Sequence, residues 1–443
     1  HMLTSIRTIY SNWFNFAAIK EDETVVTWGK TFWLNQWIGY TTIKVMTRPF
    51  PPKGVQPQLT SVKAIYSTKF AFAAKKADDT VVTWGQHDAG ADSSGVNLTS
   101  VETIFSNAKA FAAKKKDKTV VTWGHSGYGG NSAEVQPQLT LVMTIYSTAW
   151  AFAAIRDGGS VVVWGNSKYG GWFNPNVQSQ LTSGIDIIYS NDYAFAARKR
   201  NAYPSLVTWG DPRKGGDFYP ERWGSVSNVF STRAAFAALM SSGFAEVWGD
   251  TDSGAMGLPP MIEEGSVETM YSARYAFAAK KKNGSVASWG KCFGPCYSNL
   301  RSNNVQEQLT SIETVYTTDY AFAAKRTNGG VVTWGARKHG GKIDDPTYGT
   351  HMPGPLTSVD TIYSTASAFA AKTTDGSVVT WGSKYRGGKI DDPEYGTHMP
   401  GQLTSVDTVS STKWAFAAKK TDGSVVTWGM LDSKPDGSVA TWG

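Results

Sequence analysis

Short runs of alternating apolar and polar residues recur along the whole chain. One run, Val-Val-Thr-Trp-Gly or a close variant, returns every 39 to 56 residues. Its ten copies end at Gly29, Gly85, Gly124, Gly165, Gly210, Gly249, Gly290, Gly335, Gly382 and Gly429. Alternating β-branched and aromatic residues are typical of strands. The run therefore predicts a strand that closes each of ten repeats.

Two more strands are predicted upstream of this one in every repeat. The first has the pattern Val-x-Thr-Ile-Tyr-Ser, as at 101–106 and 359–364. The second is Ala-Phe-Ala-Ala, whose small residues let backbones approach closely, so we expect a crowded inner strand near a ring axis. Its phenylalanine recurs as Phe16, Phe72, Phe111, Phe152, Phe195, Phe236, Phe277, Phe322, Phe369 and Phe416. Each repeat is thus predicted to be a three-stranded meander.

A tight turn is predicted between the second and third strands. Five repeats place Asp-Gly or Asn-Gly there, at 157–158, 283–284, 328–329, 375–376 and 422–423. These dipeptides favour a type I′ hairpin, in which both central residues have positive φ.

One small meander cannot bury both of its faces, whereas meanders stacked radially cover one another. We therefore expect an all-β fold: one β-propeller domain over 1–443 with about ten short blades of three to four strands. Seven blades plus an extension, or a rod-like β-solenoid, are the alternatives. A partial repeat at 430–443 either adds a strand that helps to close the ring or belongs to a longer array.

Aromatic residues are abundant, with 18 Trp, 19 Tyr and 20 Phe. Eleven of the tryptophans occupy the recurring Trp-Gly position, so we expect them to pack between blades. No stretch of 18 apolar residues occurs. The two cysteines, Cys292 and Cys296, form either a local disulfide or a pair of free thiols.

The repeat resembles the regulator of chromosome condensation family. The matching residues are Asp422-Gly-Ser-Val-Val-Thr-Trp-Gly429 and Gly-rich turns such as Tyr128-Gly-Gly130 and Tyr169-Gly-Gly171. In period it is most similar to the family's β-lactamase inhibitor, whose blades are three-stranded. The resemblance implies a propeller but no single function, because the family includes an exchange factor, an enzyme inhibitor, ubiquitin-ligase modules and a photoreceptor. The usual Gly and His around the second strand, and the photoreceptor's Gly-Trp-Arg-His-Thr tracts, are missing here.

A two-residue slot between the first and second strands varies from repeat to repeat. It reads Trp13-Phe14, Lys69-Phe70, Ala108-Lys109, Ala149-Trp150, Asp192-Tyr193, Arg233-Ala234, Arg274-Tyr275, Asp319-Tyr320, Ala366-Ser367 and Lys413-Trp414. A turn at the same place in every blade should form one ring around one mouth of the propeller. Aromatic residues beside charges are typical of interface hot spots.

The slots therefore supply the candidate partner-binding residues, which are Trp13, Phe14, Phe70, Trp150, Tyr193, Arg274, Tyr275, Tyr320, Lys413 and Trp414. In the similar inhibitor, the equivalent loops carry aromatic residues onto the target enzyme. The alternative is that the second slot residue packs inward over the phenylalanine and plugs the channel.

Basic residues follow Ala-Ala in most repeats, and the net charge is +7. The runs lie at 75–76, 114–116, 198–200, 280–282, 325–326 and 419–420. They should form a second ring near the hairpin tips. Such a ring either protects strand edges or attracts a polyanion such as nucleic acid.

No catalytic triad, phosphate-binding glycine loop or metalloprotease motif is found in the sequence. Two near-duplicate loops, 341–351 and 388–398, each carry two aspartates and a histidine, which could seat a divalent ion. A recent duplication of one 47-residue unit explains their identity without any function. We expect no cofactor, no metal and no catalysis. The leading hypothesis is a protein-binding propeller, with a glycan-binding lectin or a nucleic-acid-binding ring as alternatives.

Overall fold

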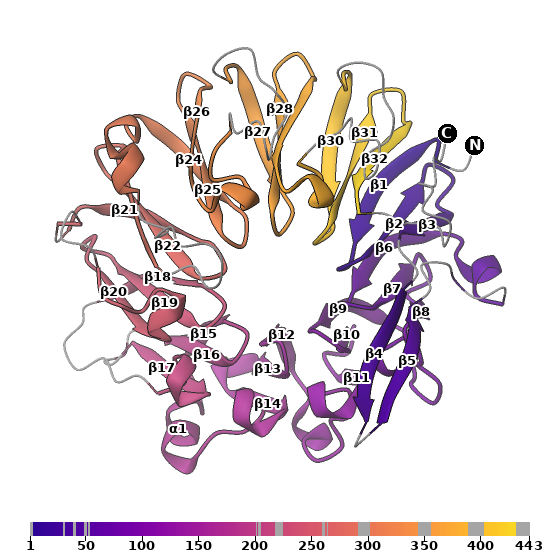
Figure 1. Cartoon of the computed structure of the whole chain (residues 1–443). Helices are drawn as coiled ribbons and strands as arrows, with labels where there is room; N and C mark the ends of the chain where they lie inside the picture. Colours follow the sequence, from indigo (N-terminus) through magenta and orange to yellow (C-terminus); the bar gives the residue numbers. More distant parts are fainter. Residues whose placement is uncertain are drawn as a thin grey trace.

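The ten repeats form ten three-stranded antiparallel sheets arranged in a ring in the computed structural model (Figure 1). The structure describes residues 3–29, 32–38, 41–47, 51, 54–200, 202, 205–217, 225–258, 262–263, 265–290, 302–343, 356–388 and 403–430. Each sheet is built from consecutive strands of one repeat, and we call the sheets blades 1 to 10 in chain order. The predicted all-β propeller with about ten blades is confirmed.

Every blade has the strand order first, second, third. The first strands are β1 (Ile6–Ser11), β6 (Val62–Ser67), β9 (Val101–Ser106), β12 (Val142–Ser147), β15 (Ile185–Ser190), β18 (Val226–Ser231), β21 (Val267–Ser272), β24 (Ile312–Thr317), β27 (Val359–Ser364) and β30 (Val406–Ser411). The second strands are β2 (Asn15–Lys20), β7 (Ala71–Lys76), β10 (Ala110–Lys115), β13 (Ala151–Arg156), β16 (Ala194–Lys199), β19 (Ala235–Met240), β22 (Ala276–Lys281), β25 (Ala321–Arg326), β28 (Ala368–Thr373) and β31 (Ala415–Lys420). The third strands are β3 (Val25–Gly29), β8 (Val81–Gly85), β11 (Val120–Gly124), β14 (Val161–Gly165), β17 (Leu206–Gly210), β20 (Ala245–Gly249), β23 (Val286–Gly290), β26 (Val331–Gly335), β29 (Val378–Gly382) and β32 (Val425–Gly429).

Short helical turns and one extra hairpin complete the described elements. Seven 3₁₀ turns follow a third strand: η2 (His87–Ala89), η3 (Ser126–Tyr128), η6 (Ser167–Tyr169), η7 (Pro212–Lys214), η8 (Thr251–Ser253), η10 (Arg337–His339) and η11 (Lys384–Arg386). The others are η1 (Gln56–Gln58), η4 (Gln136–Gln138), η5 (Asp157–Gly159), η9 (Asn303–Gln308) and helix α1 (Pro175–Gln180). The insertion after blade 1 forms the hairpin β4 (Phe32–Ile38) and β5 (Thr41–Thr47).

The innermost strand of each blade is the first strand, since first strands of adjacent blades contact one another around the axis (Figure 1). Our expectation that Ala-Phe-Ala-Ala forms the inner strand was wrong. That segment is the middle strand, paired on both edges and covered on both faces by the neighbouring blades. The middle strand needs small side chains because the neighbouring blades pack closely against both of its faces, and not because it lies near the axis.

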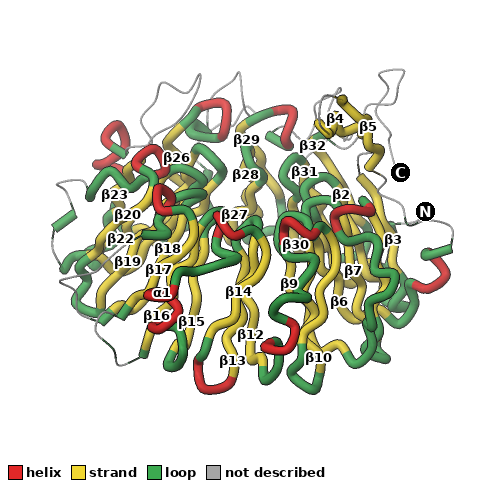
Figure 2. The backbone as a smooth tube through the Cα atoms, turned by 90° about the horizontal axis from the view of Figure 1, so that it is seen from below, coloured by secondary structure: helices red, strands yellow, loops and turns green. Residues whose placement is uncertain are grey.

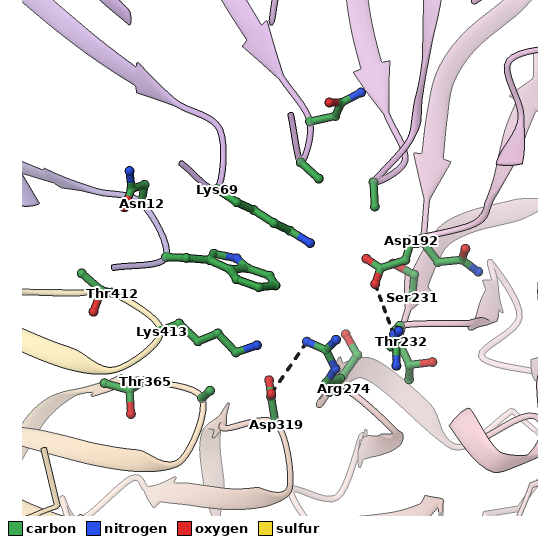
Figure 3. A pocket seen from close by; sticks show the side chains of 18 of the residues that line it. Asn12, Lys69, Asp192, Ser231, Thr232, Arg274, Asp319, Thr365, Thr412 and Lys413 are labelled. Atoms are coloured by element: carbon green, nitrogen blue, oxygen red, sulfur yellow. Dashed lines mark ion pairs between the residues drawn. The ribbon is translucent and has the colours of Figure 1, made fainter. Parts of the chain in front are cut away.

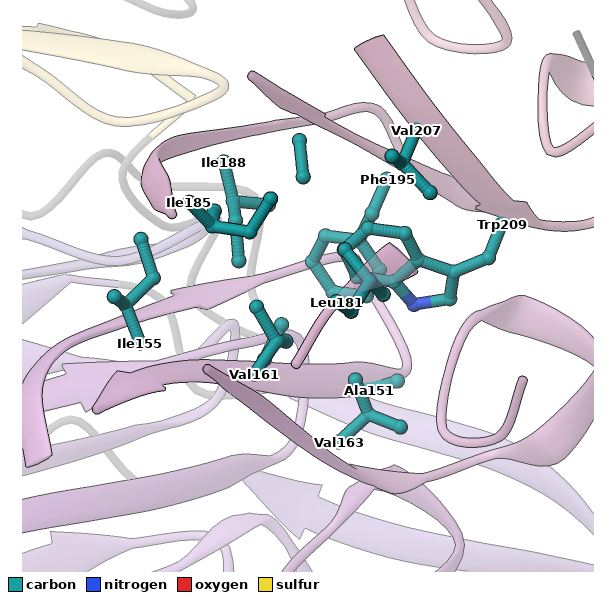
Figure 4. Packing of buried hydrophobic residues seen from close by; sticks show 12 residues of the cluster. Ala151, Ile155, Val161, Val163, Leu181, Ile185, Ile188, Phe195, Val207 and Trp209 are labelled. Carbon is teal, nitrogen blue, oxygen red and sulfur yellow. The ribbon is translucent and has the colours of Figure 1, made fainter. Parts of the chain in front are cut away.

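The hydrophobic core is divided among the interfaces between blades. Between blades 4 and 5, Phe195 and Trp209 of β16 and β17 pack with Ala151 of β13 (Figure 4). Ala153 of β13 belongs to the same buried cluster. The Phe195 and Trp209 rings stack with their centroids 5.0 Å apart. Burying one such side chain contributes about 1.5–3 kcal/mol. The recurring tryptophans are therefore packing residues, as predicted.

The ring closes between blade 10 and blade 1 through the same interface that joins the other blades. Phe16 and Trp28 of blade 1 pack on Ala415 and Ala417 of blade 10. The Ser11 hydroxyl of blade 1 donates to the Ser411 carbonyl at 2.6 Å. No described blade mixes strands from the two ends of the chain. Closure therefore rests on packing and hydrogen bonds between complete blades.

The hairpin turns lie where the Asp-Gly and Asn-Gly pairs predicted them, but the predicted type I′ geometry was wrong. In blade 10, Gly423 has a φ of 76° and its N–H donates to the Lys420 carbonyl, whereas Asp422 does not have a positive φ. This is a type I turn followed by a left-handed residue, which forms a bulge. The Asp422 carboxylate accepts hydrogen bonds from Ser424, and this side-chain turn favours the observed geometry.

Several sequence predictions fall outside the described residues. These are the states of Cys292 and Cys296, the duplicated Asp-Asp and His segments at 344–351 and 391–398, and the partial repeat after residue 430. Among the described helices, none has the length and apolar character needed to cross a membrane.

Candidate partner-binding face

The slots lie at one face of the ring, and the Asp-Gly hairpins lie at the other. Figure 2 shows the strands running between these two layers of loops. We call them the slot face and the hairpin face. In blade 2, the Thr68 hydroxyl caps the slot turn by accepting from the Ala71 N–H at 3.0 Å, and it donates to the Ala89 carbonyl of turn η2. The cap therefore holds the slot against the following 3₁₀ turn.

The first residue of every slot lines an open cavity of about 820 Å³ on the ring axis. We call this cavity the channel mouth. Its slot residues are Trp13, Lys69, Ala108, Ala149, Asp192, Arg233, Arg274, Asp319, Ala366 and Lys413. No second slot residue lines it. The alternative in which the second residue plugs the channel is therefore wrong.

The second slot residues instead lie on the slot face, where they meet side chains from the 3₁₀ turns. The rim residues are Phe14, Phe70, Lys109, Tyr128, Trp150, Tyr169, Tyr193, Arg233, Tyr275, Tyr320, His339, Ser367, Arg386 and Trp414, and we call this set the aromatic rim. Its members contact one another in sequence around the ring. Arg233 belongs to both the rim and the channel mouth.

The rim passes from blade 10 through blades 1, 2 and 3. Phe14 stacks on Trp414, with centroids 6.3 Å apart, and on Phe70, with centroids 5.9 Å apart. The Lys109 ammonium then lies 6.0 Å from the Phe70 centroid and 5.7 Å from that of Tyr128. The links among Trp414, Phe14, Phe70 and Lys109 each cross a blade boundary, and Tyr128 belongs to turn η3, which directly follows blade 3.

Tightly packed aromatic residues continue the rim over blades 4 and 5. Trp150 stacks on Tyr128 at 4.4 Å and contacts Tyr169 at 5.4 Å between centroids. Tyr169 meets Tyr193 edge-on at 5.4 Å. The Tyr193 hydroxyl accepts a hydrogen bond of 2.6 Å from the Arg233 guanidinium.

Arg233 carries the rim across blade 6 to blades 7 and 8. Its guanidinium also donates to the Tyr275 hydroxyl at 3.1 Å, so it joins two tyrosines from blades 5 and 7. Tyr275 stacks on Tyr320 at 5.3 Å, and Tyr320 contacts His339 at 4.5 Å. Burial and the neighbouring Tyr275 raise the pKa of Tyr320. It therefore remains a neutral hydrogen-bonding phenol at physiological pH.

Polar contacts close the rim through blade 9. The Ser367 hydroxyl lies 2.7 Å from His339 Nδ1 and accepts a 2.7 Å hydrogen bond from Arg386. The Arg386 guanidinium lies 3.8 Å from the Trp414 centroid, where the rim began. Burial, together with Arg386 and Lys338, lowers the pKa of His339 to about 4, so its imidazole is neutral at pH 7. Because Ser367 is fully buried, this Ser–His pair is a structural link and not an exposed nucleophile.

The structure thus divides the ten predicted partner-binding residues into two groups. Seven lie in the aromatic rim: Phe14, Phe70, Trp150, Tyr193, Tyr275, Tyr320 and Trp414. Three line the channel mouth: Trp13, Arg274 and Lys413. Trp13 connects the two groups because its ring centroid lies 6.1 Å from that of Phe14.

Sequence reasoning missed the rim residues contributed by the 3₁₀ turns. Tyr128, Tyr169, His339 and Arg386 each stand directly before a Gly-Gly pair. That position varies between repeats as the slot does, and this variation was the available signal. The left-handed glycine that follows ends the turn and brings the variable side chain beside the next slot.

The predicted basic ring lies at the hairpin face and is used within the propeller. Lys325 pairs with Glu313 of the same blade at 3.2 Å and donates to the Asp360 carbonyl of the next blade at 2.8 Å. The same two contacts recur for Lys280, Lys372 and Lys419. These cations act as ties between blades, which supports the edge-stabilising interpretation over a polyanion surface.

Within the described residues, no group of three His, Cys, Asp or Glu side chains is placed to hold a metal ion. The duplicated loops with their aspartates and histidines fall outside that part of the chain.

These features define a ten-bladed β-propeller with an aromatic rim around a charged channel mouth. Neither a family model nor a curated protein matches the sequence. Solved structures do resemble it. Yeast RCC1 (Prp20), solved bound to Kap60, is 13% identical over 98% of this chain and 82% of its own, with a TM-score of 0.32.

Two other similar structures come from different settings. The CRINKLY WD40 ectodomain of the Arabidopsis thaliana receptor kinase ACR4 is 14% identical over 62% of this chain and 95% of its own, with a TM-score of 0.36. The computationally designed Ika8 protein is 12% identical over 83% of this chain and 96% of its own, with a TM-score of 0.33. At these levels the propeller assignment rests on the ring of sheets itself.

Proposed function

We propose that this propeller is a non-catalytic protein-binding ring whose contact surface is the aromatic rim. The observation that carries the proposal is the closed series of contacts through all ten blades, made by half-buried aromatic and cationic side chains and joined at blade 9 by the buried Ser367 hydroxyl. Trp, Tyr and Arg are the residues enriched in binding hot spots. The rim places all three on one face, while the framework below it repeats.

The rim is held in place before a partner arrives. Phe14 is stacked between two neighbours, and Arg233 holds the hydroxyls of Tyr193 and Tyr275. Side chains that are already ordered lose little conformational entropy on binding, so more of the contact energy appears as affinity. This preorganisation favours a protein contact surface over a merely exposed apolar patch.

A glycan-binding role would use aromatic ring faces as open platforms for sugars. Here many of those faces are covered, since Phe14 stacks on both Phe70 and Trp414 and Trp150 stacks on Tyr128. The geometry therefore favours a broad protein contact over ten separate sugar sites.

The test removes one ring from each of three arcs of the rim. We expect Trp150→Ala, Tyr320→Ala and Trp414→Ala each to weaken a protein partner's affinity by about tenfold or more, as hot-spot truncation does. The partner is first captured from extracts of the source organism and identified by mass spectrometry. Its affinity is then measured by calorimetry with the purified pair.

Trp172→Ala is the matched control, because Trp172 is 60% exposed and lies outside the rim. It should bind like the wild type, and circular dichroism should show that all four variants are folded. Unchanged affinity in the three rim variants would remove the proposal. A glycan-array signal lost in those same variants would replace it with the lectin.

A further inference from the structure

The wall of the channel mouth carries more cationic than anionic side chains. It carries four cationic and two anionic side chains, which are Lys69, Arg233, Arg274, Lys413, Asp192 and Asp319. Both carboxylates are taken, since Asp192 lies 3.4 Å from Arg233 and Asp319 lies 3.7 Å from Arg274 (Figure 3). Two lysines are left over.

Lys69 and Lys413 come from the blades on either side of Trp13 and point toward the same space in Figure 3. Their ammonium groups lie 3.9 Å and 4.0 Å from the Trp13 ring centroid. Among the described residues, neither ammonium forms a hydrogen bond or an ion pair. The indole attracts both cations but offers no acceptor for their N–H groups.

This arrangement is unfavourable in the free protein. Burial, together with the nearby Lys413, Arg274 and Arg233 and against the opposing effect of Asp192, lowers the pKa of Lys69 to about 8. The pKa of Lys413 is also lowered, first by burial and then by Arg274. Partly buried ammonium groups favour a counter-charge. The nearest carboxylates, Asp192 and Asp319, are already paired with Arg233 and Arg274, so a ligand is the natural source of a further counter-charge.

Hydrogen bonds between adjacent blades brace the surrounding wall. Hydroxyls at the ends of the first strands donate to the carbonyl of the preceding blade, as Ser147 does to Ser106 at 2.9 Å. Slot turns also join directly, as when the Arg233 N–H donates to the Arg274 carbonyl. These wall groups do not compete for a ligand. The two lysines are the groups poised to recognise one.

The size and position of the cavity indicate what enters it. Its volume of about 820 Å³ far exceeds the roughly 30 Å³ share of one water molecule. It also lies at the centre of the aromatic rim, so a protein that covers the rim must face it. A projecting segment of such a partner would reach Lys69 and Lys413.

We propose that the channel mouth is a socket for an acidic polypeptide segment, whose carboxylates pair with Lys69 and Lys413 across Trp13. This deepens the proposed function and rests on it, because the segment belongs to the protein that the rim binds. Two ammonium groups with free donors and one indole between them suit aspartate or glutamate side chains. The rim would supply contact area, and the socket would select for charge.

The test uses the whole protein and a synthetic probe, acetyl-Gly-Glu-Glu-Glu-Glu-Gly-amide, with a glutamine peptide of the same length as the neutral control. Calorimetry at pH 7 and low ionic strength should show binding of the glutamate peptide only. The double variant Lys69→Met/Lys413→Met should weaken it by about tenfold or more. Added salt should weaken the wild-type interaction because exposed ionic contacts are screened.

The matched control is Lys118→Met/Lys338→Met, which removes the same charge from exposed positions outside the cavity. It should keep the affinity within about twofold, the change expected from long-range screening alone. Equal weakening by both double variants would overturn the socket, as would no binding of the glutamate peptide. Tighter binding of a hexathymidylate through the same lysines would overturn the polypeptide assignment.

The Trp150→Ala variant separates this proposal from the rim proposal. Trp150 does not line the cavity, so the short peptide should bind this variant like the wild type. Peptide binding without any effect of rim variants on the partner would leave the socket and discard the rim. Loss of peptide binding in Trp150→Ala would show that the peptide occupies the rim, and would discard the socket.

Discussion

Two adjacent side chains in each slot point to different places because the turn that carries them is capped. In blade 4, the Thr148 hydroxyl accepts from the backbone of both Trp150 and Ala151. This fixes the turn, so that Ala149 faces the channel and Trp150 faces the rim. One variable dipeptide thereby contributes to two surfaces.

Lys69 should reduce stability in the free protein. Its pKa is about 8 when folded and 10.5 ordinarily, so the unfolded chain binds more protons between these values. The charged Lys69 therefore lowers the free energy of unfolding at pH 7. This cost disappears as the pH increases from 8 toward 10.5 and the lysine loses its proton. We expect Lys69→Met to raise the free energy of unfolding at pH 7 by about 1–2 kcal/mol, allowing for solvent screening.

Urea unfolding followed by tryptophan fluorescence at pH 7, 8, 9 and 10 measures this gain, which should shrink as the pH rises. Lys118→Met, at an exposed position, should show no such trend. A gain that stays constant over this pH range would contradict the assignment of the cost to the Lys69 charge.

The sequence predicted the slot ring because variation inside a constant frame marks surface positions. It could not predict that Lys69 faces the channel and Phe70 the rim, since that depends on turn geometry. It also could not predict the link from His339 through Ser367 to Arg386. Those residues come from two repeats, and their proximity depends on how closely adjacent blades pack.

At the scale of elements, each of the seven 3₁₀ turns that follow a third strand covers the core of the next blade. The Gly129 carbonyl accepts from the Trp164 indole N–H at 3.0 Å. A Cβ at Gly129 would lie 2.8 Å from the Phe152 ring, and this glycine has a φ of 89°. The close approach lets the turn before the glycine place Tyr128 beside Trp150. Core packing and rim geometry are therefore coupled through this residue.

We expect Gly129→Ala to lower the free energy of unfolding by about 2–4 kcal/mol, combining backbone strain with overpacking. Gly95→Ala is the control, since Gly95 has a φ of 78° but open space around its Cβ position. It should cost only the strain, about 1 kcal/mol. Denaturant unfolding measures both variants. If Gly129→Ala and Gly95→Ala lower the free energy of unfolding equally, the added methyl group of Gly129→Ala does not clash with Phe152.

Strand content was predictable because the alternating pattern repeats ten times. Two details were not. The Ala-Phe-Ala-Ala strand suits either an axis or a sandwiched sheet, and only the packing of whole blades separates these. Asp-Gly suits a type I′ turn or a bulged type I turn, and the Asp422 contacts with Ser424 favour the second.

At the scale of the whole molecule, the junction between blades 10 and 1 is equivalent to the others in structure but not in chain connectivity. Ser11 reaches Ser411 across 400 residues, whereas Ser147 reaches Ser106 across 41. Closing the longer loop costs more chain entropy. We therefore expect the junction of blades 10 and 1 to form late in folding.

Ser11→Ala and Ser147→Ala should each lower the free energy of unfolding by about 0.5–1.5 kcal/mol, the contribution of one hydrogen bond. Their kinetics should differ: Ser11→Ala should speed unfolding and leave the folding rate unchanged, whereas Ser147→Ala should also slow folding. Stopped-flow fluorescence measures both rates. Slower folding in Ser11→Ala would show that the ring closes before the transition state.

Because every blade is a self-contained stretch of sequence, a gene encoding this ring can gain or lose one unit without leaving a strand unpaired. Each inserted copy would widen the circle by one segment and bring its own variable dipeptide. The near-identical stretches at 341–351 and 388–398 indicate that such copying has occurred here. Recombination between repeats, followed by point changes in the slots, would let a lineage adjust both the diameter of its binding surface and the residues displayed on it.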